Sequence, residues 1–137
     1  MIELHSVRQQ PQTLIVEDDP RLSYVTSAIL EDSGYSVVIV SNANDAIVQL
    51  ETSTSIETVV TDICLGPGPT GIDLAREVSS RWPKTGVIVT SGNTILECTN
   101  LPEGCLFLPK PYRPAELLTL VASFHDNPTI VEDLRAI

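Results

Sequence analysis

The chain has 137 residues, which suits one compact domain, since domains most often run about 100 to 150 residues. Eighteen acidic residues against eight basic ones give a formal net charge of −10, and so negative a surface repels nucleic-acid phosphates and anionic lipid. Three cysteines without zinc-binding spacing exclude a zinc site and favour a reduced, cytoplasmic location, and no apolar run approaches the ~20 residues of a membrane span.

The first part of the chain predicts a strand followed by a helix. After a polar leader over residues 1–10, residues 13–16 form a short apolar run that stops at three acidic residues. Asp19 suits a helix N-cap and Pro20 suits the first helical position. Gly34 is the expected helix stop, and the residues that recur at helical spacing before it are Leu22, Val25, Ala28 and Ile29.

The same pattern repeats along the chain and predicts a domain over residues 11–126. Four more apolar runs are expected to be strands, at residues 37–40, 59–62, 87–90 and 105–108. Helices are expected between them: Asn42 resembles an N-cap, a loop rich in glycine and proline precedes the next helix, and Pro114 opens the last one. The tail over residues 127–137 has no clear packing partner.

Five continuous apolar strands separated by helices predict an α/β protein with a doubly wound parallel sheet. Alternation of apolar and polar residues would be expected if one face of the sheet met water, so helices should cover both faces. The five-stranded, flavodoxin-like order 2-1-3-4-5 places the first and third strands side by side. Ligands of such sheets bind beyond the carboxyl ends of the strands, where the winding reverses.

Polar residues follow several of these strands and should converge at that edge. Glu17 and Asp18 end the first strand, and Asp62 ends the third. Three adjacent carboxylates repel one another, so a divalent cation is implied, and an all-oxygen ligand set suits Mg²⁺. The hydroxyl of Thr90 and the ammonium of Lys110 would complete a pocket for a tetrahedral dianion. This set of residues indicates phosphoryl transfer.

Four motifs carry a family resemblance over residues 11–126. They are the acidic strand end at residues 14–19, the Thr-Asp pair at 61–62, the Val-Thr-Ser run at 89–91 and the Phe-Leu-Pro-Lys-Pro run at 107–111. In this order and spacing, the chain resembles a bacterial two-component response-regulator receiver domain of the stand-alone, single-domain type. The resemblance implies a phosphorylatable switch that signals by binding other proteins.

The resemblance also implies roles for individual residues at the acidic edge. Asp62 would be the phosphoacceptor, attacking a phosphohistidine on a partner protein. Asp18 would bind Mg²⁺ directly and Glu17 through water, together with Asp62 and the main-chain carbonyl of Cys64. Lys110 would contact the phosphoryl group. The Cys64 thiol itself is expected to be a small buried side chain.

A second group of implied roles concerns the switch and its partners. Thr90 would be the switch hydroxyl, Phe107 the switch aromatic, and the Lys110–Pro111 peptide bond would be cis. The donor would be a sensor histidine kinase or a histidine phosphotransfer protein, and the target another protein, with the chain a monomer or weak dimer. The chain would catalyse its own phosphorylation and slow dephosphorylation without being a conventional enzyme. The residues considered for the docking surface are Arg21, Tyr24, Tyr112 and Arg113.

Two departures from the family pattern and two alternatives remain. The loop from Asp62 to Gly71 is one residue longer than the family's, and the interval from Thr90 to Lys110 is short, which predicts a short or irregular fourth helix. One alternative is a degenerate interaction module that is never phosphorylated. The other is a dinucleotide-binding loop through Gly66, Gly68 and Gly71, which is disfavoured because its prolines remove amide donors and it follows the third strand.

Overall fold

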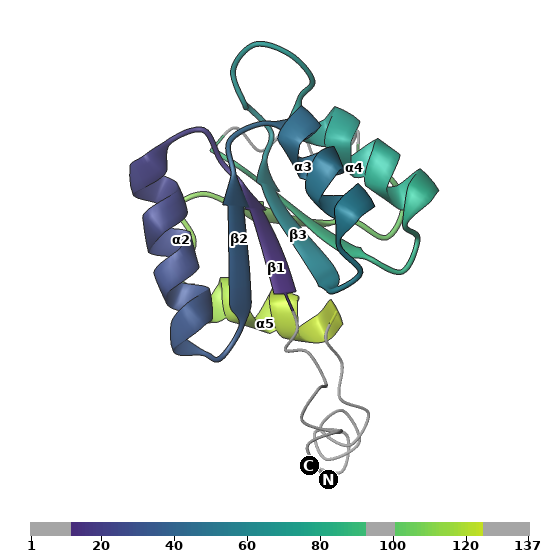
Figure 1. Ribbon diagram of the computed structural model, residues 1–137. Helices are drawn as coiled ribbons and strands as arrows, with labels where there is room; N and C mark the ends of the chain where they lie inside the picture. The colour runs from purple at the N-terminus through teal and green to yellow at the C-terminus, as the bar shows by residue number, and fades with distance from the viewer. Residues whose placement is uncertain (1–11, 93–100, 125–137) are drawn as a thin grey trace, which may run out of the picture.

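The protein is an α/β domain with one five-stranded parallel sheet (Figure 1). This computed structural model describes residues 12–92 and 101–124. The strands are β1 (Gln12–Val16), β2 (Ser36–Val40), β3 (Ile56–Asp62), β4 (Gly86–Ser91) and β5 (Leu106–Pro109). The helices are α2 (Pro20–Asp32), α3 (Ala43–Thr52), α4 (Gly71–Arg81) and α5 (Pro114–Phe124).

The strand order is β2-β1-β3-β4-β5, so the predicted doubly wound topology is confirmed. Because β1 and β3 are neighbours, their carboxyl ends meet at the point where the winding reverses. The predicted short or irregular fourth helix falls on residues 93–100, which lie outside the described residues.

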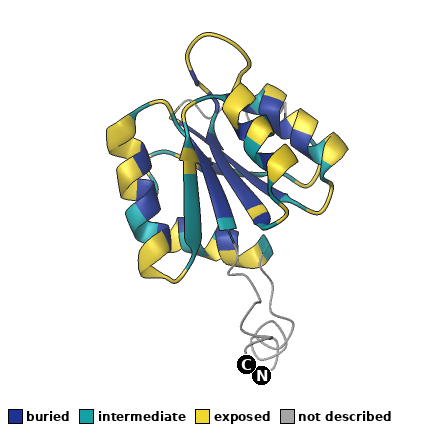
Figure 2. Cartoon of the chain, in the orientation of Figure 1, coloured by how far each residue is buried: buried dark blue, intermediate teal, exposed yellow. Residues whose placement is uncertain are grey.

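Helices cover both faces of the sheet, as the continuous apolar strands predict (Figures 1 and 2). On one face, α3 and α4 pack on a cluster that includes Leu14, Val59 and Val89. On the other face, α2 and α5 pack on a cluster that includes Ile15 and Ile88. The inner strand β4 is buried throughout, whereas the edge strand β2 is mostly half-buried. No helix in the described parts of the chain has the length and apolarity to span a bilayer.

Side-chain caps fix where the helices begin, and therefore the shape of the loops at the carboxyl edge. The side chain of Asp19 accepts a hydrogen bond from the Arg21 amide at 2.9 Å, with Pro20 in the first turn, as predicted. Asn42 caps α3 by accepting from the Asp45 amide at 2.8 Å, which is also as predicted. At the start of α4, Thr70 and Asp73 form a reciprocal capping box.

Helix α2 differs from its predicted orientation on the sheet. Leu22 and Val25 belong to the predicted apolar face, yet they are 42% and 54% exposed. The residues that α2 buries are Ser23, Thr26, Ser27 and Leu30. The helix is therefore rotated so that part of its apolar stripe faces outward.

The end of α2 agrees with its prediction. The helix ends near Gly34, whose φ of 93° lies in the left-handed region, as expected for a helix stop.

Candidate functional site

Three acidic side chains meet at the carboxyl edge of the sheet. Glu17 and Asp18 follow β1 and Asp62 ends β3, and because these strands are adjacent and parallel their ends coincide. One carboxylate oxygen from each residue lies within 4.8 Å of the others. Such a set of hard oxygen donors, partly open to solvent, fits Mg²⁺, which takes one or two carboxylates and keeps several waters.

Lys110 brings a cation to this cluster from the far edge of the sheet. Its Nζ donates to Asp62 Oδ2 at 3.0 Å and lies 3.6 Å from Glu17 Oε1. Its backbone amide donates to the Ser91 carbonyl oxygen at 2.9 Å, which continues the β4–β5 pairing to the end of β5. The side chain therefore reaches across β4 to the end of β3. The Lys110–Pro111 peptide bond is cis, the geometry that the family resemblance implies.

The pKa values of Glu17 and Lys110 respond both to burial and to the neighbouring charges. Burial raises the pKa of Glu17 above its ordinary value; the charge of Asp62 acts in the same direction, while a hydrogen bond from Asp19 and the charge of Lys110 oppose them. Burial would lower the pKa of Lys110, but the hydrogen bond and charge of Asp62, together with Glu17, raise it instead. One ammonium thus offsets only part of three adjacent carboxylates, and a further cation would be favoured here.

The remaining predicted site residues lie on β4, on β5 and in the loop after β3. Thr90 pairs with Asp62 in the β3–β4 register and is buried, and its Oγ1 donates to the Thr61 carbonyl oxygen at 3.4 Å. Phe107 is half-buried and packs on the α3–α4 side of the sheet. The Cys64 amide lies 3.4 Å from Asp62 Oδ1, but the Cys64 residue is exposed, so its predicted burial is wrong. The loop after β3 turns this side chain outward.

A groove of about 520 Å³ opens directly beside the acidic cluster. Asp62, Thr90 and Lys110 line it at the sheet edge. Its other walls are mainly apolar and come from α2, the inner strands and the segment that leads from β5 into the first residue of α5. The apolar lining residues include Leu22, Val25, Ile29, Pro111 and Pro114. Sequence reasoning missed this groove, because it expected the apolar residues of α2 to form one packed face.

The glycines between β3 and α4 have structural roles that do not require a dinucleotide. Gly66 and Gly68 have φ values of 79° and 103°, which L side chains rarely adopt, so they shape the turns of the loop. At Gly71 an added Cβ would lie 2.8 Å from the Asp62 carbonyl carbon and 2.9 Å from Ile63 Cα. Gly71 thus permits close contact between α4 and the end of β3, which sets the position of Asp62.

Comparisons with known proteins agree with this geometry. Residues 13–122 match the model of the response regulator receiver domain. The receiver protein of Sinorhizobium medicae WSM419 superposes with a TM-score of 0.79 at 30% identity, covering 85% of this chain and 94% of that one. A receiver protein of Pseudomonas putida gives a TM-score of 0.77 at 27% identity, covering 85% and 99% of the two chains. The chain belongs to the response regulator receiver domain family, the phosphoacceptor switches of two-component signalling.

A curated relative places such a domain within a much longer protein. The sensor protein TorS of Escherichia coli K12 is 33% identical over 108 residues, which are 77% of this chain. The matched region is 12% of TorS, so this chain corresponds to a small part of that relative.

Proposed function

We propose that Asp62 accepts a phosphoryl group from a phosphohistidine on a sensor histidine kinase or a histidine phosphotransfer protein. The observation that supports this most directly is the contact between Asp62 and the Lys110 ammonium, beside two further carboxylates. An Asp62 oxygen forms a bond to phosphorus while the P–N bond to histidine breaks, and the departing imidazole takes up a proton. Lys110 stabilises negative charge on the phosphoryl oxygens during this transfer.

The donor set of the cluster fits Mg²⁺ as the cofactor of this reaction. Glu17, Asp18, Asp62 and the main-chain carbonyl of Cys64 would hold the ion, with Glu17 acting through water. When bound, the ion neutralises charge on the carboxylates and on the phosphoryl group. The three carboxylates, which lie within 4.8 Å of one another beside the Lys110 ammonium, support the need for a further cation here.

Thr90 and Phe107 are proposed as the switch that reports phosphorylation. The bond from Thr90 to the Thr61 carbonyl oxygen is long at 3.4 Å, so the hydroxyl gives up little when it turns toward a phosphoryl group on Asp62. Phe107 lies on the neighbouring strand and is only half-buried, so its ring can move toward space that Thr90 vacates. One local charge would thereby select between two packing arrangements.

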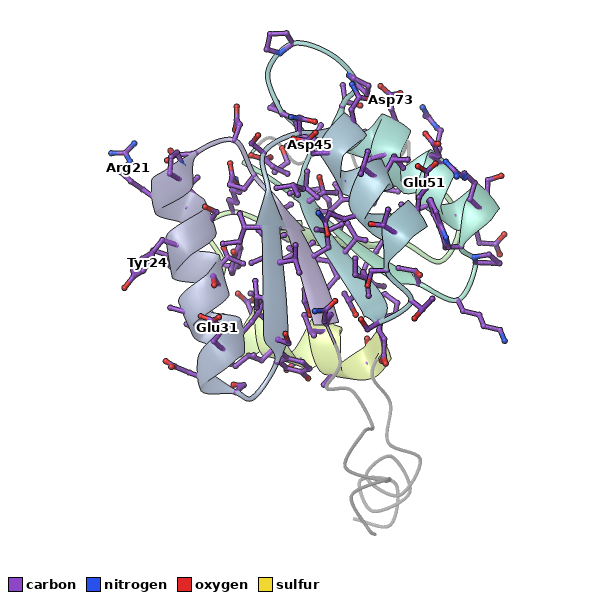
Figure 3. The ribbon with its side chains drawn as sticks, viewed as in Figure 1. Arg21, Tyr24, Glu31, Asp45, Glu51 and Asp73 are labelled. Carbon is purple, nitrogen blue, oxygen red and sulfur yellow. The ribbon has the colours of Figure 1, made fainter. Side chains whose placement is uncertain are left out.

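The groove beside Asp62 is the proposed docking surface for the phosphohistidine partner. The exposure of Leu22 and Val25 leaves apolar surface at the entrance to the acceptor, where a partner must lie during transfer. Arg21 and Tyr24 project from the outer side of α2 into solvent (Figure 3). They supply a polar and aromatic rim, of the kind that surrounds protein interfaces.

The proposal is tested by incubating the protein with Mg²⁺ and acetyl phosphate and measuring its intact mass. The wild type and an Asp32→Asn control should gain one phosphoryl group, whereas Asp62→Asn should not. Phosphorylation of Asp62→Asn would mean that another residue is the acceptor. If none of the three proteins gained a phosphoryl group, the unphosphorylated interaction module would be favoured. A beryllofluoride complex should shift the NMR signals of the Phe107 ring. Unchanged signals would reject the proposed switch of Thr90 and Phe107 but not the phosphorylation of Asp62.

A further inference from the structure

A hydrogen bond between Thr26 and Tyr112 joins the two walls of the groove. Thr26 Oγ1 and the Tyr112 hydroxyl are 2.9 Å apart, although the residues are 86 positions apart in sequence. Thr26 lies on α2, and Tyr112 lies in the segment between β5 and α5. Both residues line the groove that also contains Asp62 and Lys110.

Thr26 differs from the other hydroxyl residues that α2 buries. Ser23 donates to the Pro20 carbonyl oxygen, and Ser27 donates to a carboxylate oxygen of Glu31, so both bonds stay within or next to their own helix. Thr26 instead bonds to a different element. Thr26 is buried and Tyr112 half-buried. Because a buried hydroxyl without a partner is costly, the Thr26 hydroxyl favours keeping its bond to Tyr112.

Tyr112 is two residues from Lys110 in a segment that is anchored on both sides. The Lys110 amide is bonded to β4, and the Arg113 amide donates to Glu116 Oε1 at 2.7 Å at the start of α5. Between these anchors, the Tyr112 side chain extends to α2. Movement of Tyr112 would therefore shift the main chain from which the flexible Lys110 side chain reaches Asp62.

We propose that Thr26 and Tyr112 are a positioning pair, whose hydrogen bond holds the Lys110 segment against α2 so that the Lys110 ammonium is aimed at Asp62. The proposal rests on the proposed phosphoryl transfer to Asp62. Neither residue touches the reacting atoms. Their effect is on the maximal rate of transfer, because a charged group that is displaced by even a fraction of its contact distance stabilises the transition state less well.

The test measures phosphorylation by acetyl phosphate with Mg²⁺ over a range of donor concentrations. Tyr112→Phe and Thr26→Val should each lower the maximal rate about 3- to 10-fold, the range expected from one hydrogen bond, while the half-saturating donor concentration stays the same. The double variant should be no slower than either single variant, because one bond is lost in all three. Thr26→Ser, which keeps the hydroxyl, should retain most of the rate.

Tyr35→Phe is the matched control. Tyr35 is a half-buried tyrosine that directly precedes β2, at the amino ends of the strands and away from the acidic cluster. This variant should transfer at the wild-type rate. The positioning role would be overturned by wild-type rates in both single variants or by an equal loss of rate in Tyr35→Phe. It would also be overturned if the two losses of rate multiplied in the double variant. Unfolding midpoints measured for every variant identify any that act through stability.

An NMR measurement separates this inference from the proposed function. In the unphosphorylated protein, Tyr112→Phe should shift the amide signals of Lys110, Tyr112 and Arg113 and the signals of the Lys110 side chain. Unchanged Lys110 signals would reject the positioning pair even if Asp62 is phosphorylated. Shifted signals in a protein that acetyl phosphate cannot label would support the contact geometry while rejecting phosphoryl transfer.

Discussion

The contact between α4 and the end of β3 makes Gly71→Ala a severe test of the site's construction. An alanine Cβ would lie 2.8 Å from the Asp62 carbonyl carbon and closer still to the carbonyl oxygen. Carbon atoms pack at about 3.5 Å or more, so relief of the carbon contact alone requires α4 and β3 to separate by roughly 0.7 Å, and the nearer carbonyl oxygen requires a larger movement. The obstacle is backbone, which cannot rotate away as a flexible side chain can.

We expect Gly71→Ala to lower the free energy of unfolding by about 3 kcal/mol, the upper part of the range for overpacked sites. A gap of this size between α4 and β3 also loses a quarter to a half of the dispersion energy of their contact. Replacing glycine by alanine in a helix stabilises the helix by less than about 1 kcal/mol, which is smaller than the expected loss. Because the Gly71 amide donates to the Ile63 carbonyl oxygen at 2.8 Å, the displacement should also move Asp62 and slow its phosphorylation.

Urea unfolding provides the measurement, and Gly92→Ala provides the control. A Cβ at Gly92 meets no atom of the described residues within 4 Å, so this variant should stay within about 0.5 kcal/mol of the wild type. If Gly71→Ala is as stable as Gly92→Ala, the close approach of α4 to Asp62 is wrong, and with it the account of how the acceptor is positioned.

Three further predictions concern the fold. Thr13 is fully buried and its Oγ1 has no hydrogen-bond partner among the described residues, so Thr13→Val should stabilise the protein by about 1 kcal/mol in urea unfolding. Hydrogen bonds from the backbone and side chain of Thr70 lower the pKa of Asp73 in the folded protein. The ionised Asp73 carboxylate therefore stabilises the fold fully above its unfolded-state pKa of about 3.9, and this stabilisation is lost as pH falls through the lower folded-state pKa. The stability deficit of Asp73→Asn should therefore be largest near neutral pH and narrow toward pH ~3. Val25→Ser should cost less than about 1 kcal/mol, whereas Leu30→Ala should cost about 2 to 5 kcal/mol.

Each of these outcomes has a clear opposite. A less stable Thr13→Val would mean that the hydroxyl has a partner, such as an ordered water. A deficit in Asp73→Asn that grows in acid would contradict the sign of the pKa shift. If Val25→Ser and Leu30→Ala lowered the free energy of unfolding equally, α2 would pack on the sheet with the face that sequence periodicity predicted.

The amino-acid sequence determines the elements of this protein because their signals are local. Buried parallel strands need continuous apolar runs, and each cap needs a particular side chain within a few residues of a helix start. The convergence of Glu17, Asp18 and Asp62 also follows from sequence, since strand order alone brings the ends of β1 and β3 together. The local pattern could therefore predict the α/β fold and the acidic edge.

Only the tertiary structure decided how side chains from distant segments meet. The rotation of α2 depends on packing between the helix and the sheet, which helical spacing alone leaves open, so Val25 became exposed and Thr26 buried. The 3.0 Å contact of Lys110 with Asp62, which the strand order predicted only as proximity, and the unpredicted bond from Thr26 to Tyr112 each join segments far apart in the chain. No local pattern encodes such pairs, because their geometry is set by the summed packing of the elements that carry them.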